Sequence, residues 1–174
     1  MTLEIRTQRL RLSPATEELL RLELDDAAAF AARLGSALPE DWPPGEYDRG
    51  AIEFFLKQTV AGGESATGWY GWYVLLDEDA PDGCQLIGCG GYLGPPDADG
   101  VVEIGYSLCE KWRGRGLAKE VVSGLVENAW RRGARSVQAH TSAGNAASIA
   151  VLRGCGFQTA PCENAEQLRF ELSR

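Results

Sequence analysis

The feature that most limits the fold is a run of three short strand patterns between residues 69 and 109. Aromatic and β-branched residues are frequent in 69–76, 85–93 and 101–109, and turn-forming residues fill the gaps between these segments. The gaps are too short for a crossover helix, so the three strands are predicted to be antiparallel neighbours. The sheet that they form must then be covered by helices from elsewhere in the chain.

The other patterns supply these helices and further strands. Helical patterns cover 16–34, 51–61, 116–132 and 145–155, and strand patterns cover 3–12, 135–141, 157–160 and 166–172. The segment 101–141 is a strand–helix–strand unit, which favours one parallel pair. We therefore predict a single α+β domain over residues 1–174. Its mixed, mostly antiparallel central sheet is expected to have about seven strands flanked by about four helices.

Composition narrows the classes of function. The net charge is −8, whereas a nucleic-acid-binding domain normally carries a basic face, so no nucleic-acid partner is expected. The five cysteines include no CxxC pair and there is one histidine, which predicts free thiols in a reducing compartment and no metal site. Because neither a signal peptide nor an apolar run of about 18 residues is present, we expect a cytoplasmic protein without membrane spans.

The clearest chemical signal lies between a strand and an amphipathic helix, in the segment Arg113-Gly114-Arg115-Gly116-Leu117-Ala118. A helix N-terminus offers unpaired backbone N–H groups and the positive end of the helix dipole. Glycines let a phosphate oxygen approach the backbone, and arginines add forked donors. Neither a Walker motif nor the Rossmann GxGxxG motif fits this segment. It is therefore predicted to bind the pyrophosphate of another kind of cofactor.

Three segments in order resemble one family. Residues 113–118 are similar to the R/Q-x-x-G-x-G/A motif of the GNAT acetyltransferases. Residues 102–108 (VEIGYSL) and 145–157 (NAASIAVL…GF) resemble the E-I-G-Y-x-L and N-x-x-S-x-x-V-L…G-F signatures of its ribosomal-protein alanine N-acetyltransferase branch. The opening 7–12 also resembles the first strand of that branch. The resemblance implies a GNAT-type fold with a splayed strand pair and an N-acetyltransferase that uses acetyl-CoA.

The resemblance also implies where the cofactor lies. Its pantetheine arm is expected between the strands at 101–109 and 135–141, and its pyrophosphate at the glycine loop. The implied contact residues are Leu108, Cys109, Arg113, Gly114, Arg115, Gly116, Leu117, Ala118, Asn145 and Ser148. Asn145 also suits the N-cap of the following helix, and the two roles are compatible.

In the family reaction an amine attacks the acetyl thioester directly, aided by a base. The resemblance makes Glu103 the candidate base, and a solvated or ion-paired strand carboxylate is the alternative. Many members use a tyrosine as general acid where this chain has Leu152, so the acid is unassigned and Tyr106 and Ser107 are the candidates. Tyr106 also suits the core. His140 suits either assistance in catalysis or a packed or surface-exposed position on its strand.

The expected acceptor is a primary amine, either a peptide or protein N-terminus or a small molecule. Trp42 is expected to be exposed in a Pro-rich loop, where Asp41, Glu46 and Asp48 would favour a cationic amine or form an ordinary solvated loop. The main alternative is a non-catalytic acyl-CoA sensor or interaction module on the same fold. An RNA-binding patch at residues 112–116 is disfavoured by the net charge. The assembly is left open, with a homodimer as one form.

Overall fold

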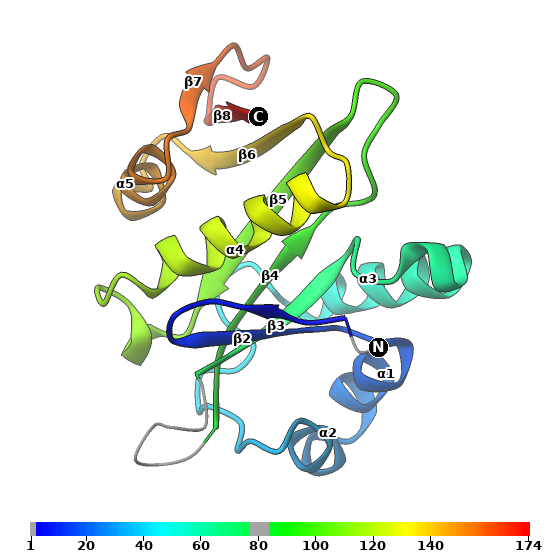
Figure 1. Ribbon diagram of the computed structural model, residues 1–174. Helices are drawn as coiled ribbons and strands as arrows, with labels where there is room; N and C mark the ends of the chain where they lie inside the picture. The colour runs from blue at the N-terminus through cyan, green and yellow to red at the C-terminus, as the bar shows by residue number, and fades with distance from the viewer. Residues whose placement is uncertain (1–2, 77–83) are drawn as a thin grey trace.

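The computed structural model describes residues 3–76 and 84–174. Within them, eight strands form one sheet in the order β1-β2-β3-β4-β5-β6-β8-β7, with helices on both faces (Figure 1). The strands are β1 (Ile5–Arg6), β2 (Leu10–Pro14), β3 (Gly71–Leu76), β4 (Gln85–Tyr92), β5 (Val101–Leu108), β6 (Ser136–Ser142), β7 (Gln158–Ala160) and β8 (Gln167–Ser173). The α-helices are α1 (Glu17–Asp25), α2 (Ala27–Leu34), α3 (Arg49–Gly62), α4 (Leu117–Arg131) and α5 (Ala146–Gly154). The predicted α+β class is confirmed.

Two predicted elements are each divided in two. The strand predicted over 3–12 is a hairpin of β1 and β2, because the Thr7 hydroxyl accepts the Leu10 N–H at 3.0 Å and turns the chain there. The helix predicted over 16–34 is interrupted at Asp26, whose carboxylate accepts the Ala29 N–H at 3.0 Å and caps α2. In both places a side-chain acceptor competes with continued regular structure.

The register of β5 and β6 produces the opening that the family resemblance implies. Val101–Ile104 pair in parallel with Ser136–Ala139. Beyond this point, β5 continues to Leu108 against β4 alone, and β6 continues to Ser142 against β8 alone. The two strands therefore part at their carboxyl ends, which confirms the predicted splayed pair.

Separate hydrophobic clusters pack on the two faces of the sheet. One contains the inner side of α4 and includes Val121, Val122 and Leu125, all fully buried. The other joins α1, α2 and α3 to the opposite face and includes Phe30 and Tyr73. Consecutive residues of β5 alternate between the two faces. Side chains of the same strand therefore reach different surroundings on each side of the opening.

Candidate functional site

The loop before α4 has the geometry expected of an anion site. Gly114 and Gly116 have φ values of 71° and 76°, and Gly116 is the N-cap residue of α4. Among the residues that the structure describes, no side chain caps this helix, so its first N–H groups depend on water or a ligand. A Cβ added at Gly114 would meet nothing within 4 Å, although its φ would strain any other residue. The backbone here is accessible to a phosphate.

The two arginines of this loop are partly engaged by the protein itself. Arg113 Nε donates to the Leu108 carbonyl at 3.0 Å, and the Arg113 N–H donates to the Glu110 carbonyl at 3.1 Å. The Arg115 guanidinium lies 5.0 Å from the centre of the Trp112 ring. The Arg113 amide, one of the predicted donors, is therefore occupied. Within residues 3–76 and 84–174, both exposed guanidinium groups keep N–H groups without a protein acceptor.

Cys109 offers little to a ligand. Its N–H donates to the Ile87 carbonyl at 2.9 Å, its carbonyl accepts the Trp112 N–H at 2.9 Å, and its side chain is buried. Burial, with Asp41 nearby, raises the pKa of the Cys109 thiol to about 12. By the alternation of a strand, the backbone of Leu108 instead faces the opening. The Leu108 carbonyl already accepts Arg113 Nε, which leaves its N–H for a ligand, whereas the N–H and the carbonyl of Cys109 are both occupied.

Tyr106 and Ser148 meet on the α5 side of the sheet. The two hydroxyl oxygens are 3.0 Å apart, and the Ser148 N–H donates to Asn145 Oδ1 at 3.0 Å. Asn145 is thus the N-cap of α5, as predicted. Burial raises the pKa of Tyr106, so its phenol stays protonated at neutral pH. Tyr106, a predicted catalytic residue, is therefore in contact with Ser148, a predicted cofactor-binding residue.

Glu103 lies on the opposite face and has a partner that sequence reasoning did not assign to it. Glu103 Oε1 is 2.8 Å from His140 Nδ1, and Glu103 Oε2 accepts a hydrogen bond from Gln138 Nε2 at 3.3 Å. Glu103 and His140 are about one quarter exposed, at 26% and 27%. The parallel register brings them together just where the strands part, and both side chains remain partly exposed there.

Ser107 shares this face but not this site. It lies four residues beyond Glu103, which is roughly 13 Å along an extended strand. A Cβ added at Gly45 would stand 2.5 Å from Ser107 Oγ, so the loop that contains Gly45 lies directly on this side chain. Ser107 is therefore too far from Glu103 for the two to act on one proton.

The same loop, residues 39–48, is anchored by a carboxylate that the sequence did not single out. Glu23 on α1 accepts hydrogen bonds from Trp42 Nε1 at 3.0 Å, Tyr47 Oη at 2.9 Å and Tyr73 Oη at 2.6 Å. Burial raises the pKa of Glu23, and these hydrogen bonds offset only part of the shift. Trp42 is half-buried, so its predicted exposure is wrong: its indole N–H turns inward to Glu23. The sequence signal for this anchoring role is Glu23 itself, the one glutamate in the mostly leucine segment 19–24 (LLRLEL).

Two of the acidic residues predicted at the mouth have structural partners. Asp41 Oδ2 accepts the Glu110 N–H at 2.8 Å, which ties the loop to the end of β5. Asp48 caps α3 by accepting the Ala51 N–H at 2.9 Å. The loop is therefore fixed at both ends beside the opening.

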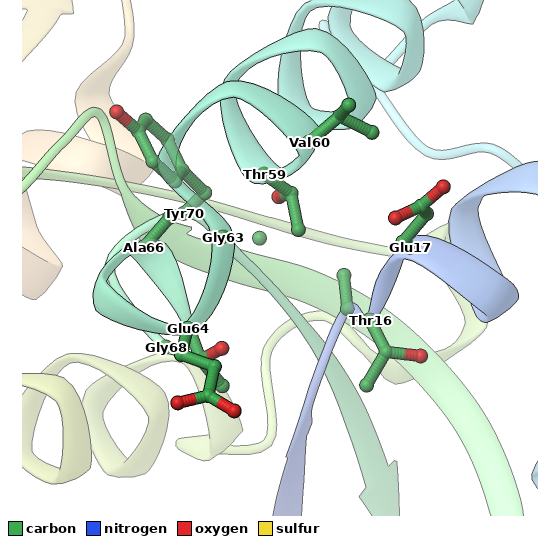
Figure 2. Close-up of a pocket in the computed structure, with 12 residues that line it drawn as sticks. Thr16, Glu17, Thr59, Val60, Gly63, Glu64, Ala66, Gly68 and Tyr70 are labelled. Carbon is green, nitrogen blue, oxygen red and sulfur yellow. The ribbon is translucent and has the colours of Figure 1, made fainter.

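The pocket in Figure 2 lies elsewhere. It has a volume of about 240 Å³ and is formed by the start of α1, the end of α3 and the segment 63–71, including Thr16, Thr59 and Tyr70. A larger pocket of about 580 Å³ lies under residues 36–41 and reaches Cys109 and Trp112. Neither is lined by residues of β6, α4 or α5. In the described ranges, no group of acidic, histidine and cysteine residues could hold a metal ion, and no helix could span a membrane.

Comparison with known proteins agrees with this geometry. The model of the acetyltransferase (GNAT) domain family matches residues 9–158, which include the glycine loop, Glu103 and the start of α5. The chain belongs to the GNAT acetyltransferases. It is therefore an N-acetyltransferase, as a relative also indicates: the uncharacterized N-acetyltransferase YjdG of Bacillus subtilis (strain 168) is 26% identical over 154 residues, 88% of each chain.

Solved structures of acetyltransferases share the fold. An acetyltransferase from Agrobacterium tumefaciens has a TM-score of 0.65 at 22% identity, covering 100% of this chain and 96% of its own. RimL, a ribosomal L7/L12 alpha-N-protein acetyltransferase in complex with coenzyme A, has a TM-score of 0.68 at 19% identity, covering 98% of both chains. A Salmonella typhimurium enzyme that modifies the N-terminal serine of L7/L12 has a TM-score of 0.64 at 18% identity, covering 99% of both.

Proposed function

We propose that this GNAT enzyme transfers an acetyl group from acetyl-CoA to a primary amine, and that the acceptor is the N-terminal amine of a peptide or protein. The observation that carries the proposal is the Glu103–His140 pair at the point where β5 and β6 part. The ribosomal-protein acetyltransferases that share the fold support the choice of acceptor.

The cofactor contacts come from the residues around the opening. The uncapped N-terminus of α4, with Gly114, Gly116 and the free donors of Arg113 and Arg115, suits the pyrophosphate. The Leu108 N–H faces the parted strands and suits the pantetheine arm, while the Leu108 carbonyl is held by Arg113. Leu117 and Ala118 supply the first amides of α4, and Asn145 and Ser148 border the same side from α5.

The reaction needs a neutral amine. An α-amine has a pKa of about 7.7–8.0, against about 10.4 for a lysine side chain, so far more of it is neutral at pH 7. The nitrogen lone pair attacks the acetyl carbonyl carbon, the amine proton passes to the Glu103–His140 pair, and the C–S bond breaks to release the coenzyme A thiolate. The thiolate then takes up a proton, and the Tyr106 hydroxyl beside Ser148 is the candidate to relay that proton from water.

Acetylation of defined peptides tests this proposal. Peptides beginning with serine or alanine, and small amines such as a polyamine, are incubated with acetyl-CoA and followed by mass spectrometry. The Glu103→Gln variant should lower turnover by at least about a hundredfold, the usual contribution of a general base. Its affinity for coenzyme A, measured by calorimetry, should stay unchanged because Glu103 lies on the face away from α4.

Glu127→Gln is the matched control, since this exposed glutamate lies on the outer side of α4. Wild-type turnover in Glu103→Gln would remove the pair as base. Tight coenzyme A binding without acetylation of any amine would favour the acyl-CoA sensor instead.

A further inference from the structure

The turn between β1 and β2 contacts the first turn of α4, although more than half of the sequence separates the two turns. Thr7 Oγ1 donates to Glu120 Oε2 at 2.9 Å, and the Arg9 N–H donates to the same oxygen at 3.1 Å. Arg9 Nε donates to the other carboxylate oxygen, Glu120 Oε1. A hairpin distant in sequence thus binds both oxygens of a carboxylate at the start of the helix.

Arg9 also reaches the glycine loop itself. Its Nη1 donates to the Arg115 carbonyl at 3.1 Å, and its Nη2 lies 3.6 Å from the position that a Cβ on Gly116 would take. In a planar trans peptide, the carbonyl of Arg115 and the N–H of Gly116 point in opposite directions. Holding that carbonyl toward the hairpin therefore directs the Gly116 N–H away from it, to the open side of the loop.

The pairing also removes an electrostatic obstacle. Glu120 lies within the first turn of α4, where its negative charge would repel a bound pyrophosphate. Burial would raise the pKa of Glu120, but the hydrogen bonds from Arg9 and Thr7 outweigh burial and lower it. The carboxylate thus stays charged, and the adjacent Arg9 guanidinium, whose side chain is 44% exposed, balances it.

We propose that Arg9 is a positioning residue for the cofactor's pyrophosphate: it neutralises Glu120 and fixes the peptide plane between Arg115 and Gly116. The inference rests on the proposed use of acetyl-CoA. A single forked side chain makes both contacts at once, since Nε binds Glu120 while Nη1 binds Arg115. Lysine would keep the charge but has one nitrogen for both acceptors.

The test compares coenzyme A with pantetheine, which lacks the pyrophosphate and the nucleotide. Dissociation constants are measured by calorimetry for coenzyme A and by NMR titration for pantetheine. Arg9→Gln and Arg9→Lys should each weaken coenzyme A binding by about tenfold or more, whereas pantetheine affinity should change less than about twofold. The matched control Arg33→Gln removes another exposed arginine that pairs with one glutamate, Glu18, and should alter neither affinity.

Each other outcome counts against the inference. Unchanged coenzyme A affinity in Arg9→Gln would show that the hairpin does not position the loop. Full affinity in Arg9→Lys would show that charge alone matters, and an equal loss for both ligands would indicate general disturbance of the fold. A wild-type protein that binds no coenzyme A would instead overturn the proposed function, on which the inference depends.

Discussion

Gly105 leaves free space on the face of β5 along which we propose that the acceptor amine approaches. It lies between Glu103 and Ser107 on the same face of β5, it is exposed, and a Cβ added there would meet nothing within 4 Å. Its φ lies outside the left-handed region, so the backbone accepts other residues without strain. An amine that approaches Glu103 along this face would pass over Gly105.

Filling this space should block the acceptor. In Gly105→Val we expect turnover with a peptide amine to fall by at least about tenfold, because the added methyl groups occupy the approach to Glu103. Gly105→Ala should cause a smaller loss. Initial rates and coenzyme A calorimetry measure the two effects, and coenzyme A affinity should persist in both variants. Wild-type turnover in Gly105→Val would mean that the amine approaches from another direction.

At the scale of elements, the loop 39–48 depends on a buried carboxylate of α1. Trp42 and Tyr47 hold the loop to Glu23, and Gly45 places it against Ser107 of β5. Three donors satisfy the buried carboxyl group, which offsets part of the cost of burying it. The hydrogen bonds that hold this loop in place are therefore coupled to the protonation of Glu23.

This coupling predicts a pH dependence of stability. The pKa of Glu23 is raised above its ordinary value of 4.5, so the folded protein binds the proton more tightly than the unfolded chain does. The stabilisation linked to this group is complete below about pH 4.5 and is lost as the pH rises through the raised pKa. The difference in unfolding free energy between the wild type and Glu23→Gln should therefore decrease with rising pH.

Urea unfolding from pH 4 to pH 8, roughly the range over which proteins are most stable, measures this difference. Glu17→Gln, an exposed position on the same helix, is the control and should show no such trend. A difference that is constant over this range, or that grows with pH, would contradict the raised pKa.

At the scale of the whole molecule, one sheet joins the two hydrophobic clusters. Leu125 at the centre of α4 is fully buried, and its carbonyl accepts the Tyr92 hydroxyl at 2.6 Å. Asn128 donates to the same hydroxyl at 2.9 Å, and burial raises the pKa of Tyr92 to about 12, so the group stays neutral. The helix that presents the glycine loop is thus fixed to the sheet by apolar packing and by a satisfied buried polar group.

Truncation of this helix's buried face should lower stability sharply. Leu125→Ala should reduce the free energy of unfolding by about 2–5 kcal/mol, through lost burial and an unfilled cavity. Leu93→Ala, at a leucine that is 49% exposed, should change it by less than about 1 kcal/mol. Urea denaturation measures both, and equal losses would contradict the central place of α4 in the core.

Local chemistry explains why the sequence alone was sufficient for much of the molecule. Several signals can be recognised from a few neighbouring residues. They are the helical spacing of Val121, Val122 and Leu125, the glycines before them, and Asn145 as an N-cap. Such patterns predicted the α+β class, whereas the resemblance of three motifs to the GNAT family implied the splayed strand pair. The local patterns also predict that the glycine loop lies at the start of α4.

Contacts between distant segments were decided only by the tertiary structure. The pairing of Glu103 with His140 depends on the parallel register of β5 and β6, and the approach of Arg9 to Glu120 depends on where the hairpin packs. Neither follows from the spacing of residues along the chain, because register and packing minimise the free energy of the whole fold. The sequence by itself determined which elements form and which loop suits a phosphate. The tertiary structure decided which side chains pair, as Glu103 does with His140 and Arg9 with Glu120.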